Sequence, residues 1–357
     1  MNDKYASITE GLEENLRGNK EAGTFSITTD LRNVYYNFTT EERIKLGTGQ
    51  NLPNGAEIFN DYINCKATGR YAHAENSSIA TGNYAHSEGY STIASGNYSH
   101  TEGRYSQATQ SDSHAEGYMT KALAVQSHAE GHSTEASGNQ SHAEGLRTKA
   151  SKDYAHAEGF ESIASGMGAH AEGRYTEASK DYAHAEGLRT KALNFSSHAE
   201  GDTTEASGGQ AHSEGLLTQA IGARSHAEGY QTVAIGEDAH SEGNKTLASG
   251  NYSHARGQGT IAKGIAQTTC GRYNIVNEQD LFIVGNGTSD SNRSNAFEVH
   301  SDGRVSVGAD PKEDMDVVNL KTLMDIVGNI SEVLATITDS NTREVLMTLV
   351  EGKVEEE

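Results

Sequence analysis

The sequence predicts an all-β solenoid: a parallel β-roll in which each turn is a 14-residue repeat. A histidine recurs every 14 residues from His86 to His254, 13 times in succession. Small residues recur at fixed places in the same units, with alanine eight residues after the histidine in every unit from Ala94 to Ala262. A short period held for so long is typical of solenoids, which stack one small structural unit on the next.

The composition excludes several other classes of protein. The chain has 357 residues, of which 34% are hydrophobic; it has no tryptophan, 39 glycines and a formal net charge of −22. This is too little apolar material for a conventional core. Low hydrophobicity with high charge is also typical of disorder, but a disordered chain has no need of fixed spacing. The sequence has no basic patch of the kind that predicts nucleic-acid binding. It also has no apolar run of the kind that predicts a membrane helix or a secretory signal.

Residues 1–61 precede the repeats and have a mixed pattern. Residues 12–17 and 40–46 have a helix-like composition, whereas residues 24–38 favour a strand. The first unit of the roll starts within residues 62–72, because Ala67 and Gly69 already match the later units. The first full turn, from His73 to His86, is one residue short.

Each repeat can be numbered from its histidine as position 1. Side chains alternate between the two faces of a strand, so positions 14 and 2 share one face and positions 1 and 3 the other. Positions 2, 7, 9 and 14 are small, which predicts that they fill a narrow interior. Glycine at position 4, and usually at position 11, is expected to turn the corners with a positive φ. The residue type at position 8 varies (Ile93, Gln107, Lys121), which predicts that this side chain is exposed to solvent.

The histidine and glutamate of each repeat point outward, yet they barely vary along the chain. Turns spaced by about 4.8 Å would stack the glutamates in a column, with a repulsion of about 3.5 kcal/mol per adjacent pair at an effective dielectric of 20. Histidines of neighbouring chains would relieve it, so the sequence favours self-association through this face. The expected interface residues are His86, Glu88, His100, Glu102, His114, Glu116, His128, Glu130, His142, Glu144, His156, Glu158, His170, Glu172, His184, Glu186, His198, Glu200, His212, Glu214, His226, Glu228, His240 and Glu242.

Two alternatives remain open for this face. The histidines and glutamates can form a solvated surface on which water screens the repulsion. A metal-binding surface is the weaker alternative, because one His-x-Glu pair supplies only two ligands and a dozen near-identical pairs suggest architecture. We therefore assign no catalytic, cofactor-binding or metal-ligating residue from the sequence.

After the roll, the repeat pattern decays and two other elements follow. Residues 281–308 favour strands, with a hairpin turn at Asp302-Gly303. Beyond Pro311 an apolar series with alternating spacings of three and four predicts a helix with a heptad seam: Leu320, Leu323, Val327, Ile330, Leu334 and Ile337. Isoleucine at the second apolar position of a heptad, as at Ile330 and Ile337, disfavours a dimer and favours assemblies of more helices. The alternative is an amphipathic helix packed on its own domain.

The repeats resemble the left-handed parallel β-roll units of YadA-type trimeric autotransporter adhesin heads. The resemblance covers about residues 62–271 and lies in the period and in corners such as Ala94-Ser95-Gly96 and Ala234-Ile235-Gly236. The family strand usually reads Ser-Val-Ala-Ile-Gly, with both aliphatics facing a three-fold axis. Here the strand reads Ser225-His226-Ala227-Glu228-Gly229. The resemblance therefore implies a homotrimer with the His and Glu columns at its axis.

Autotransporters need a signal peptide and an anchoring barrel, and the sequence shows neither. The His-Ala-Glu-Gly form, followed by the segments 281–290 and 295–299, looks more like tail fibre or neck-appendage proteins of phages and prophages. Some of those relatives carry a C-terminal autoproteolytic chaperone domain. Only 86 residues follow Gly271, which is too few for that domain, and the sequence offers no nucleophile–base arrangement. We therefore expect no enzyme activity.

These observations together predict four regions. They are an N-terminal attachment or trimer-initiating region (1–61), the β-roll (62–271), a β-rich cap (272–310) and a C-terminal helical trimerisation segment (311–357). The expected function is structural and adhesive: a phage or prophage tail fibre that presents a rigid trimeric surface to the host. The expected partners are further copies of the chain, a host glycan or surface protein, and other virion tail proteins. The alternatives are a bacterial surface adhesin and a monomeric metal- or ice-binding solenoid.

Overall fold

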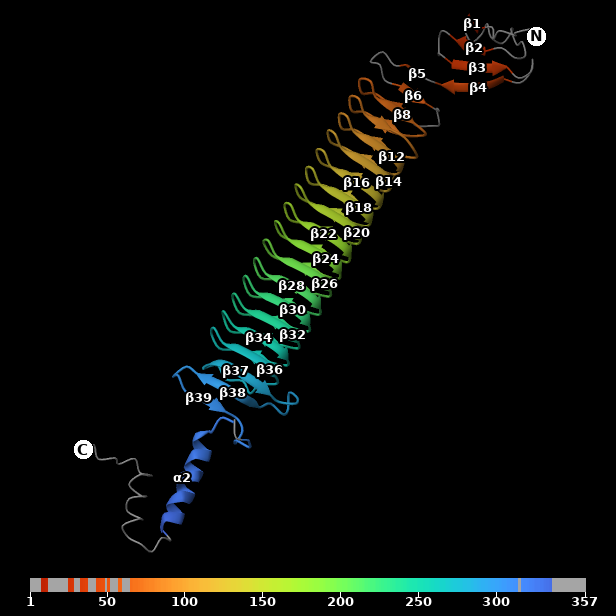
Figure 1. Ribbon diagram of the computed structural model, residues 1–357. Coiled ribbons are helices and arrows are strands. Elements are labelled where there is room, and N and C mark those ends of the chain that lie inside the picture. Colours follow the sequence, from red (N-terminus) through yellow and green to blue (C-terminus); the bar gives the residue numbers. More distant parts are fainter. Residues whose placement is uncertain are drawn as a thin grey trace, which may run out of the picture. The chain divides into compact units, whose positions relative to one another are not determined.

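The protein is a mostly-β parallel solenoid of about 16 turns, built from 14-residue repeats, with one C-terminal helix. The computed structural model describes residues 65–313 and 316–335, with side chains up to residue 328, and the backbone of six strands between residues 8 and 59. The chain divides into two compact units, residues 1–224 and 225–357. In each unit the turns of the roll lie one above another (Figure 1). The predicted solenoid and its period are confirmed.

Each turn contributes two short strands. One begins at the repeat histidine and the other ends at the repeat alanine. In the first unit the histidine strands are β8 (His73–Glu75), β10 (His86–Ser87), β12 (His100–Arg104), β14 (His114–Tyr118), β16 (His128–His132), β18 (His142–Leu146), β20 (His156–Phe160), β22 (His170–Arg174), β24 (His184–Leu188), β26 (His198–Asp202) and β28 (His212–Leu216). The alanine strands are β7 (Lys66–Ala67), β9 (Ile79–Ala80), β11 (Ile93–Ala94), β13 (Gln107–Ala108), β15 (Lys121–Ala122), β17 (Glu135–Ala136), β19 (Lys149–Ala150), β21 (Ile163–Ala164), β23 (Glu177–Ala178), β25 (Lys191–Ala192), β27 (Glu205–Ala206) and β29 (Gln219–Ala220).

The second unit repeats this arrangement and then ends it. Its roll strands are β30 (His226–Tyr230), β31 (Val233–Ala234), β32 (His240–Asn244), β33 (Leu247–Ala248), β34 (His254–Gln258), β35 (Ile261–Ala262) and β36 (Thr268–Arg272). Strand β37 (Asp280–Asn286) pairs in parallel with β36. Strands β38 (Asn295–His300) and β39 (Val305–Val307) then complete an antiparallel sheet with β37, and the Asp302-Gly303 turn lies between them.

Equivalent residues of successive turns pair in register. His100 pairs with His114 and Glu102 with Glu116, so the histidine and the glutamate of one turn lie over those of the next, whereas position 5 pairs unlike residues such as Arg104 and Tyr118. Backbone hydrogen bonds join the turns on both sheets; for example, the His100 amide donates to the Ser113 carbonyl at 2.9 Å. A parallel sheet needs a crossover between its paired strands, and here the other half of the turn supplies it.

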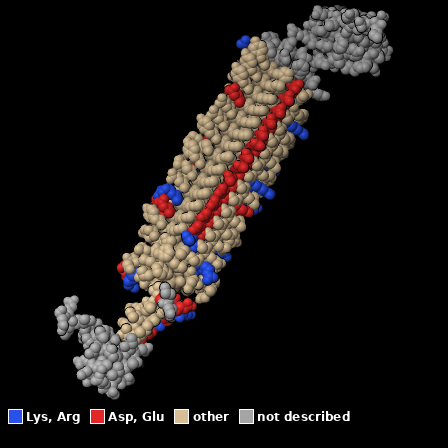
Figure 2. All heavy atoms as spheres, viewed as in Figure 1, with Lys and Arg blue, Asp and Glu red and all other residues tan. Residues whose placement is uncertain are grey.

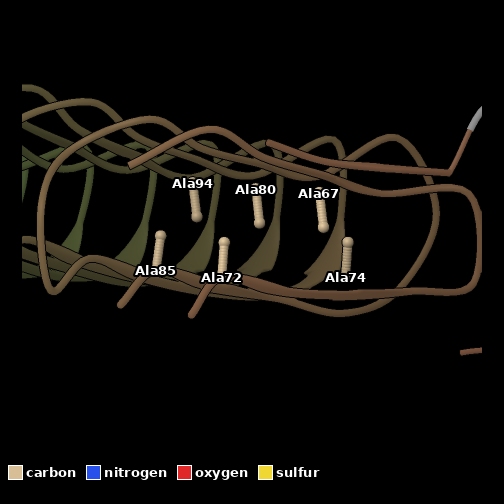
Figure 3. Close-up of a cluster of buried hydrophobic side chains, with 6 residues drawn as sticks. All are labelled: Ala67, Ala72, Ala74, Ala80, Ala85 and Ala94. Carbon is tan, nitrogen blue, oxygen red and sulfur yellow. The ribbon is translucent and has the colours of Figure 1, made fainter. Parts of the chain in front are cut away.

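The interior of the roll is filled by small side chains, as the sequence predicts. The repeat alanines at position 9 are at most 1% exposed, and the residues at positions 2, 7 and 14 are buried with few exceptions. Figure 3 shows Ala67, Ala80 and Ala94 of one sheet pointing toward Ala72, Ala74 and Ala85. The two sheets are therefore too close together for larger residues.

Hydroxyl groups inside the roll are paired within and between turns. Ser87 Oγ lies 2.8 Å from Thr101 Oγ1, and Ser99 Oγ donates to the Gly96 carbonyl at 2.7 Å. Where position 2 is serine, the threonine at position 7 has a partner, as in Ser241 with Thr246 at 2.8 Å. Several threonines that follow an alanine at position 2, such as Thr134, have no hydrogen-bond partner for the buried hydroxyl within the described chain.

The corners confirm one glycine prediction and correct the other. The position-4 glycines have φ between +87° and +113°, outside the range that other residues adopt readily. The position-11 glycines do not have positive φ; at Gly96 a Cβ would lie 1.8 Å from the Gln110 carbonyl oxygen, so close approach explains the glycine there. Left-handed backbone occurs instead at positions 6 and 13, mostly at residues other than glycine, such as Tyr98 (φ 57°) and Tyr105 (φ 61°).

The N-terminal strands form a separate four-stranded sheet. They are β1 (Ile8–Gly11), β2 (Phe25–Thr28), β3 (Asn33–Asn37) and β4 (Arg43–Thr48). The helix-like interpretation of residues 40–46 is wrong: β4 pairs with β3, and Ile44 and Leu46 alternate with two basic residues as in a strand. Residues 12–17 lie outside the described residues.

Two further elements flank the repeats. Strands β5 (Gln50–Asn51) and β6 (Glu57–Phe59) form an antiparallel pair, and β6 pairs in parallel with β8. The histidine sheet therefore includes backbone before residue 62, where the sequence placed the start of the roll. At the other end, helix α2 (Leu320–Ala335) contains all the predicted seam residues except Ile337, which lies outside the described residues.

Candidate functional site

In each unit the histidines at position 1 form a stacked ladder along the turns. Ring centroids of successive histidines lie 4.7 Å apart for His114 and His128 and 4.8 Å apart for His128 and His142, with interplanar angles of 11° and 1°. The same stacking continues in the second unit, where His240 and His254 lie 4.7 Å apart. In-register pairing of the histidine strands causes this stacking, because it places each ring over the ring of the previous turn.

The glutamates at position 3 form a second column beside the histidines. The predicted residues lie on the outer face of strands β10 to β32, and a row of acidic side chains is visible along one face of the roll (Figure 2). The side chains of His114 and Glu116 are 36% and 37% exposed. The face is thus half-buried within a single chain. We call these two columns the His/Glu ladder.

Within a turn, the imidazole and carboxylate are close but do not form a well-aligned hydrogen bond. The distance between His Nε2 and Glu Oε2 is 3.4 Å in the His86–Glu88 pair, 3.5 Å in His114–Glu116 and 4.0 Å in His100–Glu102. The Nε2 atoms of these three histidines are buried and have no hydrogen-bond partner within the described chain.

In the later turns the histidine instead approaches the glutamate of the preceding turn. His240 Nε2 lies 3.3 Å from Glu228 Oε1, and His254 Nε2 lies 3.2 Å from Glu242 Oε1. The ladder can therefore pair histidine and glutamate either within a turn or between turns.

The single chain favours neutral histidines. Burial lowers the pKa of His86, His100 and His128, and the neighbouring histidines lower it further; the adjacent glutamates raise it by less. The pKa values of His156, His184 and His198 are lowered for the same reasons. Within one chain, burial is thus the largest cause of the lowered histidine pKa, and stacking on neighbouring histidines adds to it.

When the histidines are neutral, the carboxylate column has little compensating charge among the described residues; Arg256 Nε lies 4.0 Å from Glu242 Oε1 at its C-terminal end. At the N-terminal end of the ladder, burial raises the pKa of Glu75, and the neighbouring Glu88 raises it further. Glu88 acts first through a hydrogen bond between the two carboxyl groups and then through charge repulsion. A cation or a donor from outside the chain would stabilise the column.

Successive turns bring three possible metal ligands together. In groups such as His114, Glu116 and His128, one nitrogen or oxygen atom from each residue lies within 4.8 Å of the other two. The sequence provided only the two ligands of a single turn. The third ligand comes from the in-register stacking of the next turn.

Two sets of exposed side chains, one of tyrosines and one of aromatic residues with arginines, were not predicted. Tyr71, Tyr84 and Tyr98 stack at position 13, with centroids 5.2 Å and 5.0 Å apart. At positions 5 and 6 the Arg104 guanidinium lies 5.2 Å from the centre of the Tyr105 ring. The recurrence of tyrosine at position 13 is the signal in the sequence that could have identified the tyrosine set.

The cap contains a hydroxyl–imidazole–carboxylate chain that sequence reasoning missed. His300 Nδ1 lies 2.6 Å from Asp280 Oδ1, and His300 Nε2 lies 2.7 Å from Ser306 Oγ. The expectation that no nucleophile–base arrangement exists is therefore wrong as a statement about geometry. The Asp280 side chain is only 2% exposed, and the three residues lie on paired strands β37, β38 and β39. We assign this chain of hydrogen bonds the structural role of joining those strands.

The first two residues of the heptad seam of α2 are exposed in the single chain, and Val327 is half-buried. Leu320 and Leu323 are 70% and 49% exposed, and the adjacent Met324 is 62% exposed. A helix packed on its own domain would bury such residues, so this part of the helix does not fit that alternative.

Among the described residues, no helix has both the length and the apolar character needed to traverse a bilayer. Comparison of the whole chain with known protein families and with curated proteins finds no match.

Proposed function

We propose that this protein is a homotrimeric, structural and adhesive fibre of a phage or prophage tail. Three left-handed β-rolls would associate through their His/Glu ladders, and the α2 helices would form a trimeric coiled coil. The fibre would present a rigid surface for attachment to the host. Its partners would be a host glycan or surface protein and other tail proteins of the virion.

The observation that carries the proposed assembly is the exposed seam of α2. Leu320 and Leu323 begin a heptad series, and exposed leucines at such spacing are buried when helices associate. Isoleucine at later seam positions favours more than two helices. The resemblance of the repeats to trimeric adhesin heads supports three.

The interior of the roll supports association as well. A core made almost entirely of alanine, serine and threonine buries little apolar surface per residue, so one isolated roll gains little from the hydrophobic effect. The half-buried ladder offers each chain a second surface to bury. Across a three-fold axis, histidines of one chain would face glutamates of another.

The adhesive role is supported by the exposed tyrosine and arginine side chains. Tyr98 is 61% exposed, and similar rings recur along the roll. Aromatic rings with a polar group are common at recognition surfaces. Three copies of a weak site on a stiff support bind a surface with much higher avidity than one copy does.

Multi-angle light scattering of the full-length, untagged protein tests the assembly. We expect three times the chain mass of 38.1 kDa. A monomer at micromolar concentration would overturn the proposed trimer. Immunogold labelling then tests the location: label on tail structures supports the fibre, whereas label on host cells that carry no virions supports a bacterial surface adhesin instead.

A further inference from the structure

The His/Glu ladder has the ligands and spacing of a divalent cation site. We propose that it binds zinc-class cations, each held by the Nε2 atoms of two successive histidines and one carboxylate oxygen of the glutamate between them. The groups His114–Glu116–His128 and His240–Glu242–His254 are examples from the two units. Each group lies within one chain, so the inference does not depend on the trimer.

The separation of the histidine and glutamate atoms within one turn supports an ion between them, and the next imidazole, stacked with its centroid 4.7 Å away, would have to turn toward that ion. Ligands bound to tetrahedral zinc at about 2.0–2.1 Å stand roughly 3.3–3.4 Å apart. The Nε2–Oε2 distance is 3.4 Å in the His86–Glu88 and His184–Glu186 pairs and 3.5 Å in His114–Glu116. These distances are long for a hydrogen bond and suitable for two ligands of one ion.

Two of the imidazole nitrogens in the first unit also form no hydrogen bond with the described residues. They are the buried Nε2 atoms of His114 and His184. A buried polar atom without a partner is costly. Coordination through the Nε2 lone pair, with the ring proton on Nδ1, would satisfy these atoms.

The sharing of histidines between neighbouring groups limits the number of ions that the ladder can hold. One Nε2 atom binds one ion, so the overlapping groups that share His128 cannot both be filled. The ladder can therefore hold at most one ion for every two turns. One divalent ion carries two positive charges, and two turns contribute two glutamates. This occupancy neutralises the carboxylate column.

Zinc is favoured over calcium and magnesium because of the ligand types. Two imidazoles and one carboxylate suit zinc, copper and nickel, whereas calcium and magnesium prefer oxygen ligands. The fourth position of a tetrahedral ion is left for water or for a ligand from another chain. In a trimer this position would face the other ladders.

The test compares two histidines of the same strand, β16. His128 belongs to the ladder, whereas His132 is exposed and lies outside it. Untagged full-length protein is stripped with a chelator, loaded with Zn²⁺ and passed through a desalting column, and the bound metal is measured by mass spectrometry. We expect retained zinc in the wild type, a loss of about one ion per chain in His128→Gln and no loss in His132→Gln. Equal zinc in both variants, or none in the wild type, would overturn the proposal.

Cobalt substitution tests the geometry directly. Co²⁺ bound to imidazole nitrogens and a carboxylate in a tetrahedral site gives strong visible absorption, and Glu116→Gln with Glu130→Gln should reduce it. The weak spectrum of hydrated Co²⁺ would show that the ladder only attracts cations loosely, which would also overturn the proposal. Light scattering of the metal-free protein separates this result from the trimer: a metal-free trimer leaves the proposed fibre intact.

Discussion

At the residue scale, the structure depends most on the glycine at position 4. Gly201 has a φ of +108°, and a Cβ there would lie 2.2 Å from the carbonyl oxygen of Gly215. Both the backbone conformation and the contact with the next turn therefore exclude a side chain. Gly209 lies in the same turn, but a Cβ built on it meets no atom within 4 Å.

Replacing Gly201 with alanine should therefore destabilise the roll strongly. We expect a loss of more than about 3 kcal/mol from strain and from the displaced turn, whereas Gly209→Ala should change stability by less than about 0.5 kcal/mol. Chemical denaturation followed by circular dichroism measures both. Similar stability of the two variants would show that the corner tolerates a Cβ.

The hydrogen-bond chain in the cap makes a second prediction at this scale. Asp280→Asn removes a charged acceptor from a buried site and should cost about 1–3 kcal/mol. Ser306→Ala removes a single hydrogen bond and should cost about 1 kcal/mol. Asp302→Asn is the control, because Asp302 is exposed in the same cap. Thermal melts that show no difference between the Asp280 and Asp302 variants would contradict the structural role.

At the element scale, stacking converts single histidines into a coupled column. The folded chain lowers the pKa of six of its histidines, so the unfolded chain binds protons more readily as the pH falls. Their contribution to stability is full above the ordinary histidine pKa of about 6.5. It is lost as the pH falls through that value toward the lower folded pKa.

The melting temperature of a metal-free, monomeric form of the protein should therefore fall between about pH 7.5 and about pH 5.5. A series of thermal melts in chelator-containing buffer measures it. Variants that lack the repeat histidines are poor controls, because their packing changes as well. Thermal melts over a series of salt concentrations at each pH are the informative control. A melting temperature that rises toward acid would mean that assembly brings glutamates of other chains to the histidines and reverses the sign.

At the element scale, features that depend on strand alternation could be predicted from the sequence, whereas features that depend on contacts between elements could not. Strand alternation has fixed geometry, so the burial of Ala94 and the outward direction of His100 follow from spacing alone. The left-handed residues at position 13 could not be found this way, because Tyr98, Asp112 and Gln126 share no glycine-like signal. The histidine pKa direction and the cap network depend on contacts between turns and between three strands, which no local pattern records.

At the scale of the whole molecule, the proposed trimer makes adhesion depend on the helical seam. Leu320→Glu with Leu323→Glu places charges on the exposed seam of α2 and should weaken association of the helices. Lys321→Gln is the control: it alters an exposed residue between the two leucines and should leave the molar mass of the assembly, measured by light scattering, as in the wild type.

If the seam variant is monomeric, its binding to host cells should fall by about 10²–10⁴-fold, because avidity from several linked sites is lost. Flow cytometry with labelled protein measures the binding, and light scattering measures the mass. A monomeric variant that binds as tightly as the wild type would show that adhesion does not need several copies.

The in-register repeat also makes the turns of a unit interchangeable. If every turn presents the same residues to its neighbours, a misalignment by one whole turn preserves nearly all contacts between strands, and only the atypical ends can specify the correct alignment. The short turn from His73 to His86 and the buried Gln267, which donates to the carbonyl of Asp280 at 2.7 Å, are such markers. Deleting residues 128–141 should therefore leave a folded protein with one turn fewer, whereas deleting residues 128–134 should prevent folding. Circular dichroism and limited proteolysis would distinguish the two, and through such deletions or duplications a gene could change the number of turns without redesigning either end.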